Sequence, residues 1–184
     1  MFEKLTLNDK VFNSPLQPPP EGEALDSMAF LIPSLRGRVR EGLEGCREVK
    51  EISLLIIHCS ATLPGQRVSV QDIDRWHRQR GFDCIGYHFY ITVDGTIWTG
   101  RPLNRIGAHC KGYNTHSIGI CYEGGLDEEG RPCDTRTLLQ KAALVALINK
   151  LREMYPTADV VGHCDLDLNK ACPCFSAVGE YNSD

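Results

Sequence analysis

The chain has 184 residues, which is enough for one domain with a full hydrophobic core and too few for two ordinary domains. Hydrophobic residues make up 42% of it and charged residues 24%, as in soluble globular proteins, so a fibrous or disordered chain is excluded. A net charge of -4 without a long basic run argues against a nucleic-acid partner. No stretch approaches about 18 consecutive apolar residues, so we expect neither a membrane-spanning helix nor a membrane partner.

Residues 1–48 differ in composition from the rest of the chain. They contain a proline cluster at 15 and 18–20, followed by a stretch rich in glycine and arginine. They lack the basic start and the long apolar core of a secretory signal peptide. We therefore predict an N-terminal extension over 1–48, packed as an arm on one domain over 49–184, and a protein that is cytoplasmic as synthesised.

The first predicted elements of the domain are a buried strand and a helix. Residues 52–57, ISLLII, form a continuous apolar run that is typical of a strand buried on both faces, and His58 stands at its end. A helix is predicted to begin near Ser69, because its spacing to Asp72 matches a capping box, and to end before Gly81.

A hairpin is predicted next. Residues 85–93 alternate in a way that puts Tyr87 on the apolar face of a strand and His88 on the opposite face, and Asp94-Gly95 gives a tight turn into a second strand. We interpret His88 as a packing residue behind the site. The following Trp98 suits either a sugar-binding groove or the core.

The C-terminal half supplies two more strands around a long helix. A strand is predicted over 117–122, a helix from about Thr135 to Met154, which ends before Pro156, and a last strand over 158–162. Strands that alternate with helices indicate an α/β fold with a mixed central β-sheet flanked by helices. His77 and His116 are interpreted as surface or helix-face residues.

Three residues have the chemistry of a metal site. His58 and His163 each follow an apolar strand, and ligands collect beyond the carboxyl ends of strands in open α/β sheets. Cys172 precedes Pro173 in a segment predicted to be extended, with Lys170 on the same face. Two histidines and one cysteine would leave the fourth position of a zinc ion open, as in catalytic sites. Taken singly, each histidine or cysteine is more readily interpreted as a structural residue than as a metal ligand.

The nine cysteines exceed what such a site needs. Without a secretion signal we expect thiols rather than a disulfide framework. Cys59, Cys110 and Cys164 each follow a histidine, which favours metal chemistry for some of them, and Cys164 or Cys174 could replace Cys172 as the ligand. A redox or metal-buffering protein is a further alternative, which the absence of a CxxC pair argues against.

Five motifs occur in order between residues 52 and 175: IIHCSAT, GYHF, GAHCKGYN, SIGIC and KACPCF. This pattern resembles the type 2 N-acetylmuramoyl-L-alanine amidases, which include phage lytic amidases and animal peptidoglycan recognition proteins. The resemblance implies Zn²⁺ as the cofactor. The site residues that it implies are His58, His163 and Cys172 as metal ligands, Tyr87 and Lys170 as catalytic side chains, and His109 and Asn114 along the substrate groove.

The implied activity is zinc-dependent hydrolysis of the amide bond between N-acetylmuramic acid and L-alanine in bacterial peptidoglycan or muropeptides. The alternative is a peptidoglycan-binding module without catalysis. Family members that only bind typically lack the ligand cysteine, so Cys172 favours the enzyme. We expect a monomer that acts on the cell wall after release, from a phage, a prophage or a bacterium.

Overall fold

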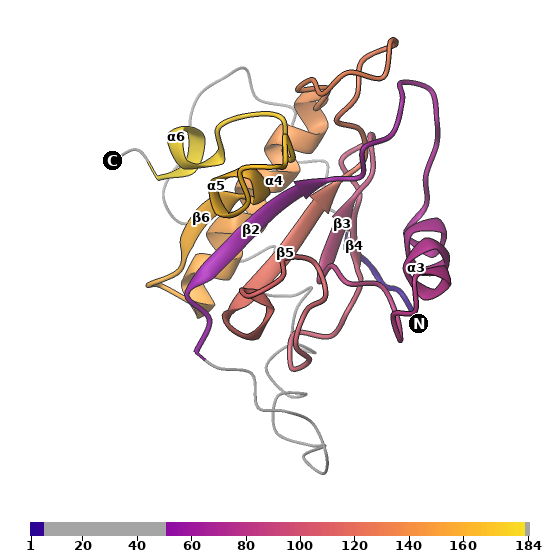
Figure 1. Ribbon diagram of the computed structural model, residues 1–184. Helices are drawn as coiled ribbons and strands as arrows, with labels where there is room; N and C mark the ends of the chain where they lie inside the picture. Colours follow the sequence, from indigo (N-terminus) through magenta and orange to yellow (C-terminus); the bar gives the residue numbers. More distant parts are fainter. Residues whose placement is uncertain (6–50, 183–184) are drawn as a thin grey trace.

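The computed structural model describes residues 1–5 and 51–182 (Figure 1). Its centre is a six-stranded sheet in the order β1-β4-β3-β5-β2-β6. The strands are β1 (Lys4–Leu5), β2 (Leu54–Cys59), β3 (Phe89–Ile91), β4 (Ile97–Thr99), β5 (Ser117–Tyr122) and β6 (Asp159–Gly162). Strand β2 runs parallel to β5 and β6, β3 runs parallel to β5, and β4 pairs antiparallel with β3 and β1. The predicted mixed sheet is confirmed.

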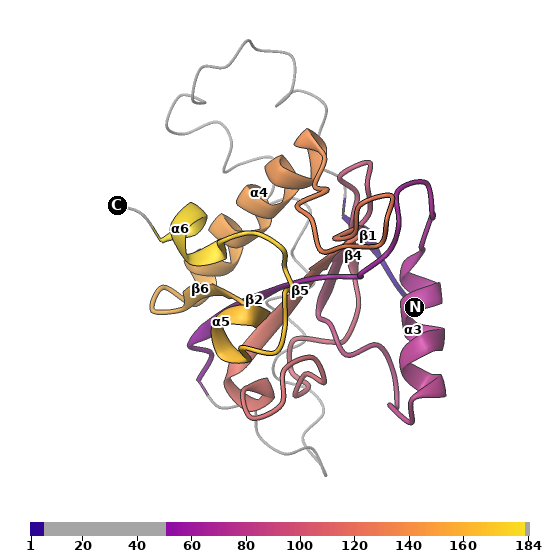
Figure 2. The ribbon, with the colours of Figure 1, turned by 45° about the horizontal axis from the view of Figure 1, so that its top comes forward.

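Helices cover both faces of this sheet. The helical elements are α3 (Val70–Gln79), the 3-10 helix η2 (Asn114–His116), α4 (Leu138–Met154), α5 (His163–Leu166) and α6 (Ala177–Tyr181). Figure 2 shows α4 and α6 on one side of the strands and α3 on the other. None of the helices in the described part of the chain has the length and apolar character needed to cross a membrane.

The core is divided between the two faces because successive side chains of a strand point to opposite sides. Leu55 and Ile57 of β2 pack with Leu144 of α4 in the larger cluster. Val70 and Ile73 of α3 belong to a smaller cluster on the other face. His58 follows Ile57 in the strand, so its side chain projects toward the face that carries α3.

Both predicted helices have the expected start signals. Ser69 and Asp72 form the capping box of α3. Helix α4 begins at Leu138, three residues later than predicted, because Thr137 and Gln140 form its capping box while Thr135 Oγ1 accepts a hydrogen bond from Gly125 N–H at 2.7 Å. The side chain of Thr135 therefore anchors the preceding loop instead of the helix.

The predicted strand over 85–93 is wrong in its first half, since β3 begins only at Phe89. The backbone of residues 85–87 bonds to other groups. Arg101 Nε donates to the carbonyl oxygen of Ile85 at 2.9 Å, and Gly86 N–H donates to His77 Nδ1 at 2.8 Å. The alternating pattern reflects burial in a side-chain-supported loop, which periodicity cannot distinguish from a strand.

The first residues of the predicted extension join the sheet. Lys4 pairs with Trp98 and Leu5 with Ile97, so β1 covers the edge of β4. Residues 6–50 lie outside the described residues, and the boundary at residue 48 stays a prediction.

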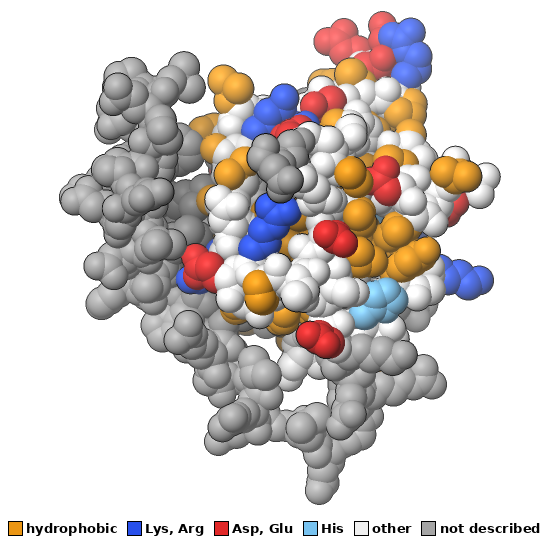
Figure 3. Space-filling view, turned by 90° about the vertical axis from the view of Figure 1, so that its left-hand side faces the viewer, with side chains coloured by type: hydrophobic (Ala, Val, Ile, Leu, Met, Phe, Trp, Pro, Cys, Tyr) orange, Lys and Arg blue, Asp and Glu red, His pale blue; other side chains and the backbone are white. Residues whose placement is uncertain are grey.

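The face of the molecule in Figure 3 carries acidic and basic side chains interspersed with hydrophobic ones.

A buried arginine connects α4 to the C-terminal segment. The Arg136 side chain is 1% exposed and pairs with Asp134 at 2.9 Å and with Glu180 at 2.8 Å. Its guanidinium also donates to Tyr181 Oη at 3.0 Å and lies 3.2 Å from the centroid of the Phe175 ring. Because burial makes each lost partner expensive, this cluster should carry a large share of the anchoring of α6.

We predict that Arg136→Met lowers the free energy of unfolding by about 3 kcal/mol, because it leaves two carboxylates without their buried partner. The matched control is Arg131→Met, which removes a 69% exposed guanidinium paired with Asp127 and Glu129, and which should cost less than about 1 kcal/mol. Urea unfolding of the metal-free variants measures both values. Equal losses for the two variants would contradict the role of Arg136.

Candidate metal centre

Two histidines meet at the carboxyl ends of neighbouring parallel strands. Ile57 of β2 lies opposite Gly162 of β6, and each is followed by a histidine. His58 is therefore buried near the end of β2, and His163 opens α5 directly after β6. Their ring centroids are 4.7 Å apart, so the predicted convergence of these two side chains is confirmed.

Cys172 reaches the histidines from a tight turn. The predicted extended conformation is wrong here, because Cys164 N–H donates to the carbonyl of Cys172 and Cys174 N–H donates to that of Ala171, both at 2.7 Å. Cys172 Sγ lies 3.8 Å from His58 Nδ1 and accepts a hydrogen bond from Cys59 N–H at 3.2 Å. The turn thus points the thiol toward the end of β2.

The donor atoms of these three residues fit one metal ion. Those of His58, His163 and Cys172 all lie within 4.8 Å of one another, and the described residues contain no other such group of three. Tetrahedral zinc with usual bond lengths places nitrogen and sulfur ligands about 3.6 Å apart, close to the 3.8 Å between Cys172 Sγ and His58 Nδ1. Borderline-soft nitrogen and sulfur donors also suit zinc.

The alternative cysteines occupy other places. Cys174 Sγ donates to the carbonyl of Gly125 at 3.2 Å and lies 3.8 Å from Cys59 Sγ, and neither residue belongs to the three-residue group. A hydrogen bond with Cys172 is the main reason that the pKa of Cys59 is raised to about 12. Cys164 is also outside the group, and all eight cysteines of the described residues are free thiols.

Tyr87 lies beside the first histidine. Its ring centroid is 5.1 Å from that of His58 and 5.2 Å from that of His77. Burial, followed by the nearby Cys121 thiol, raises the pKa of the Tyr87 phenol well above its ordinary value. The phenol therefore keeps its proton at neutral pH and can act as a hydrogen-bond donor.

Lys170 is exposed on the rim of the site. Its backbone N–H donates to the carbonyl of Asp167 at 3.0 Å, so the chain turns just before it. Burial, followed by the positive charge of Lys170, lowers the pKa of His163. The shared face of an extended segment is absent, and the catalytic role of Lys170 stays a prediction.

His109 and Asn114 lie behind His58 in one loop. His109 Nδ1 is 3.0 Å from His58 Nε2, and Asn114 Oδ1 accepts hydrogen bonds from the backbone of His109 and Cys110, both at 2.9 Å. Burial, followed by the His58 ring, lowers the pKa of His109 well below its ordinary value. The loop is thus held by its asparagine and presents a neutral imidazole to His58.

His77 lies on one face of α3, which is one of its two interpretations, whereas the interpretation as a surface residue is wrong. It is buried on the inner side of α3, where its Nδ1 accepts from Gly86 N–H, and burial lowers its pKa to about 4. Its place in the apolar helical repeat was the signal for this. His88 packs behind the site as predicted: Gly119 N–H donates to its Nδ1 at 3.0 Å, and its Nε2 lies 3.2 Å from the carbonyl of Arg105.

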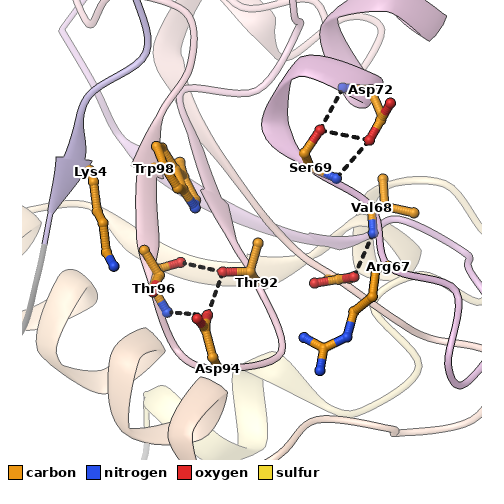
Figure 4. A pocket seen from close by; sticks show the side chains of 10 residues that line it. Lys4, Arg67, Val68, Ser69, Asp72, Thr92, Asp94, Thr96 and Trp98 are labelled. Atoms are coloured by element: carbon orange, nitrogen blue, oxygen red, sulfur yellow. Dashed lines mark hydrogen bonds between the residues drawn. The ribbon is translucent and has the colours of Figure 1, made fainter.

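Trp98 lines a separate cavity of about 420 Å³. Figure 4 shows Trp98 and Arg67 on opposite sides of it, with Lys4 and the hairpin residue Asp94 nearby. The side chain also packs partly against the smaller core cluster. None of the three candidate metal ligands lines this cavity, and a sugar-binding role for Trp98 stays a prediction.

Comparison with known proteins identifies the family of this chain. A family model described as N-acetylmuramoyl-L-alanine amidase (Amidase_2) matches residues 48–175. The chain belongs to this amidase family. The amidase is 42% identical to the endolysin of Enterobacteria phage K11 over 126 residues, which cover 68% of this chain and 83% of the phage protein. It is 41% identical to the endolysin of Escherichia phage T7 over 121 residues, which cover 66% and 80%.

Solved structures agree with this assignment. N-acetylmuramoyl-L-alanine amidase LysC from Clostridium intestinale URNW is 31% identical with a TM-score of 0.61, and the match covers 74% of the amidase and 90% of LysC. A Drosophila PGRP-LB mutant in complex with tracheal cytotoxin is 27% identical with a TM-score of 0.61, covering 74% and 84%. The predicted fold, family and enzyme class are confirmed: the chain is an N-acetylmuramoyl-L-alanine amidase of the endolysin type, which hydrolyses peptidoglycan.

We predict that His88 makes the metal-free amidase less stable in mild acid. Burial lowers the pKa of His88 from 6.5 to about 4, so the unfolded chain binds the proton first as the pH falls. The stabilisation is fully present above pH 6.5 and decreases toward pH 4, by about 3 kcal/mol in total. In His88→Asn this part of the pH dependence should disappear from urea unfolding curves.

The matched control is His116→Gln, which makes a comparable change at an imidazole that is partly exposed instead of buried. A His88→Asn slope equal to that of the wild type would show that His88 is protonated equally in the folded and unfolded states.

Proposed function

We propose that the amidase holds one zinc ion with His58, His163 and Cys172 and uses it to cut the amide bond between N-acetylmuramic acid and L-alanine. The observation that carries this proposal is the convergence of two imidazoles and one thiol within 4.8 Å of one another. Three protein ligands leave one tetrahedral position for the reaction, as in catalytic zinc sites. The substrate is polymeric peptidoglycan or its muropeptide fragments.

Zinc supplies Lewis acidity, which polarises a carbonyl and makes hydroxide available near neutral pH. The protein's own part in the reaction is to hold the lactyl carbonyl of muramic acid beside the ligands and to stabilise charge there. Hydrolysis converts that carbonyl to a carboxylate and releases the L-alanine nitrogen as an amine. The negative charge that develops on the carbonyl oxygen needs positioned donors.

Tyr87 and Lys170 are proposed as those donors. Support comes from the Tyr87 ring, 5.1 Å from His58, and from the raised pKa that keeps its phenol protonated. Lys170 adds an ammonium on the exposed side, and its charge acts on His163. One donor comes from the sheet side and the other from the solvent side, so the oxygen would lie between them.

We also propose that the loop containing His109 and Asn114 borders the substrate groove. Its support is the position of His109 against His58 and the hydrogen bonds by which Asn114 holds the loop. The endolysin relatives favour a lysis enzyme that meets the cell wall after release. A monomer that is cytoplasmic as synthesised stays a prediction from the sequence.

The first test is digestion of purified peptidoglycan, with the products identified by mass spectrometry. We predict stem peptides with a free L-alanine amine, which disappear after chelation and return when zinc is added back. Cys172→Ala should lose both zinc and activity, whereas Cys133→Ala, at an exposed cysteine, should retain both. Retention of the protein on an uncut wall would instead support the binding module.

We predict that Tyr87→Phe lowers kcat by about 100-fold, because a lost donor to the developing oxyanion costs roughly 2.7 to 4 kcal/mol. The control Tyr155→Phe removes a phenol hydroxyl outside the site and should leave kcat unchanged. Lys170→Met should also lower kcat, in contrast to Lys150→Met on α4, where the ammonium pairs with Glu153. Initial rates on a defined muropeptide measure all four, and unchanged kcat in Tyr87→Phe would contradict its role.

A further inference from the structure

We infer that His109 is a positioning residue that fixes the tautomer of His58 through a directed chain of hydrogen bonds. The chain runs from the carbonyl of Tyr113 through Ser117 and His109 to His58, on the side of His58 away from Cys172. This inference rests on the proposed metal site, and it gives His109 a task that is separate from any contact with substrate.

The contacts of this hydrogen-bonded series follow one another without a break. Ser117 Oγ donates to the carbonyl oxygen of Tyr113 at 2.8 Å, and the same hydroxyl lies 3.5 Å from His109 Nε2. At the other edge of that ring, His109 Nδ1 lies 3.0 Å from His58 Nε2. The remaining nitrogen of His58, Nδ1, is the atom that lies 3.8 Å from Cys172 Sγ.

The carbonyl oxygen of Tyr113, at one end of this series of hydrogen bonds, fixes the direction of every bond in it. A carbonyl oxygen only accepts, so the Ser117 hydroxyl gives its proton to Tyr113 and can only accept from His109. His109 Nε2 then carries a proton, which leaves Nδ1 of the neutral ring as an acceptor. His58 Nε2 must donate to it, and the neutral His58 ring therefore presents an unprotonated Nδ1 toward Cys172. A lone pair on that atom is what a metal ion requires.

The fold makes room for the His109 ring. A Cβ atom at Gly107 would lie 2.5 Å from the ring, and one at Gly119 would lie 2.6 Å from it. Both glycines belong to sequence motifs, GAHCKGYN and SIGIC, that contain none of the three proposed metal ligands. His88 packs edge-on against the ring with centroids 5.7 Å apart. The ring is thus confined on several sides, so that its nitrogens stay aligned with Ser117 and His58.

The test compares zinc affinity in two variants of similar size. In His109→Asn the side-chain oxygen can replace Nδ1 as the acceptor, whereas His109→Leu removes the acceptor. Competition with a chromophoric chelator, without substrate, measures the zinc Kd. We expect His109→Asn within about threefold of the wild type and His109→Leu weakened by about 10- to 100-fold, the usual effect of losing a partner behind a metal ligand.

A second variant reaches the same ring from another element. Gly119→Ala adds a methyl group against the His109 ring and leaves every polar side chain in place, so it should also weaken zinc binding. Unfolding midpoints of the metal-free proteins, together with the visible spectrum of the cobalt(II) forms, separate positioning from general destabilisation. The inference is supported if folded His109→Leu has a changed cobalt spectrum while His109→Asn has the spectrum of the wild type.

The outcomes distinguish this inference from the proposed function. If the wild type binds zinc and both His109 variants bind it equally well, the positioning role is overturned while the zinc amidase stands. If both variants bind zinc like the wild type but have a raised KM for muropeptide, His109 acts only on substrate, which also overturns the inference. A wild type without zinc affinity would overturn the proposed function itself.

Discussion

The site depends on the register of two parallel strands. Because Ile57 lies opposite Gly162, the residues that follow them leave the sheet at the same edge, and both are histidines. The different side chains packed on the two faces of β2 specify this register, since β2 lies between β5 and β6, and its alternate residues contact α4 on one face and the α3 side on the other. A shift of one residue would turn His58 toward α4 and put Ile57 or Cys59 in its place.

The third ligand is held by a different set of interactions. Tyr122 Oη donates to the carbonyl of Pro173 at 2.6 Å, and Arg136 lies over the ring of Phe175. Cys59 N–H points at Cys172 Sγ from the end of β2. The turn that carries the thiol is therefore tied to the sheet and to the start of α4, and the stability of the C-terminal segment bears directly on the metal site.

Much of the fold was predictable because its signals are local. The apolar runs of β2 and β5 and the capping box at Ser69 each depend on neighbouring residues, and the structure reproduces them. The loop at Ile85 was not predictable, because Arg101 and His77, distant in sequence, take the backbone bonds that a strand would use.

The metal ligands could be predicted from the sequence, whereas the residues that hold those ligands in place could not. The ends of two apolar strands, together with the resemblance carried by the five motifs, led to His58, His163 and Cys172, and the structure brings these together. The contact between His109 and His58, across 51 residues, depends on how the loop folds back over β5. The buried position of His77 was missed although its spacing from Val70 and Ile73 places it on the apolar face of α3, because an imidazole at such a position was interpreted as polar surface.

The most direct test of the account is zinc K-edge X-ray absorption of the purified amidase. Stoichiometric zinc with two nitrogen neighbours at about 2.0 Å, one sulfur at about 2.3 Å and one further light atom is the predicted result. Two or more sulfur neighbours would mean that Cys59 or Cys174 joins the metal, and this would contradict a site made by His58, His163 and Cys172.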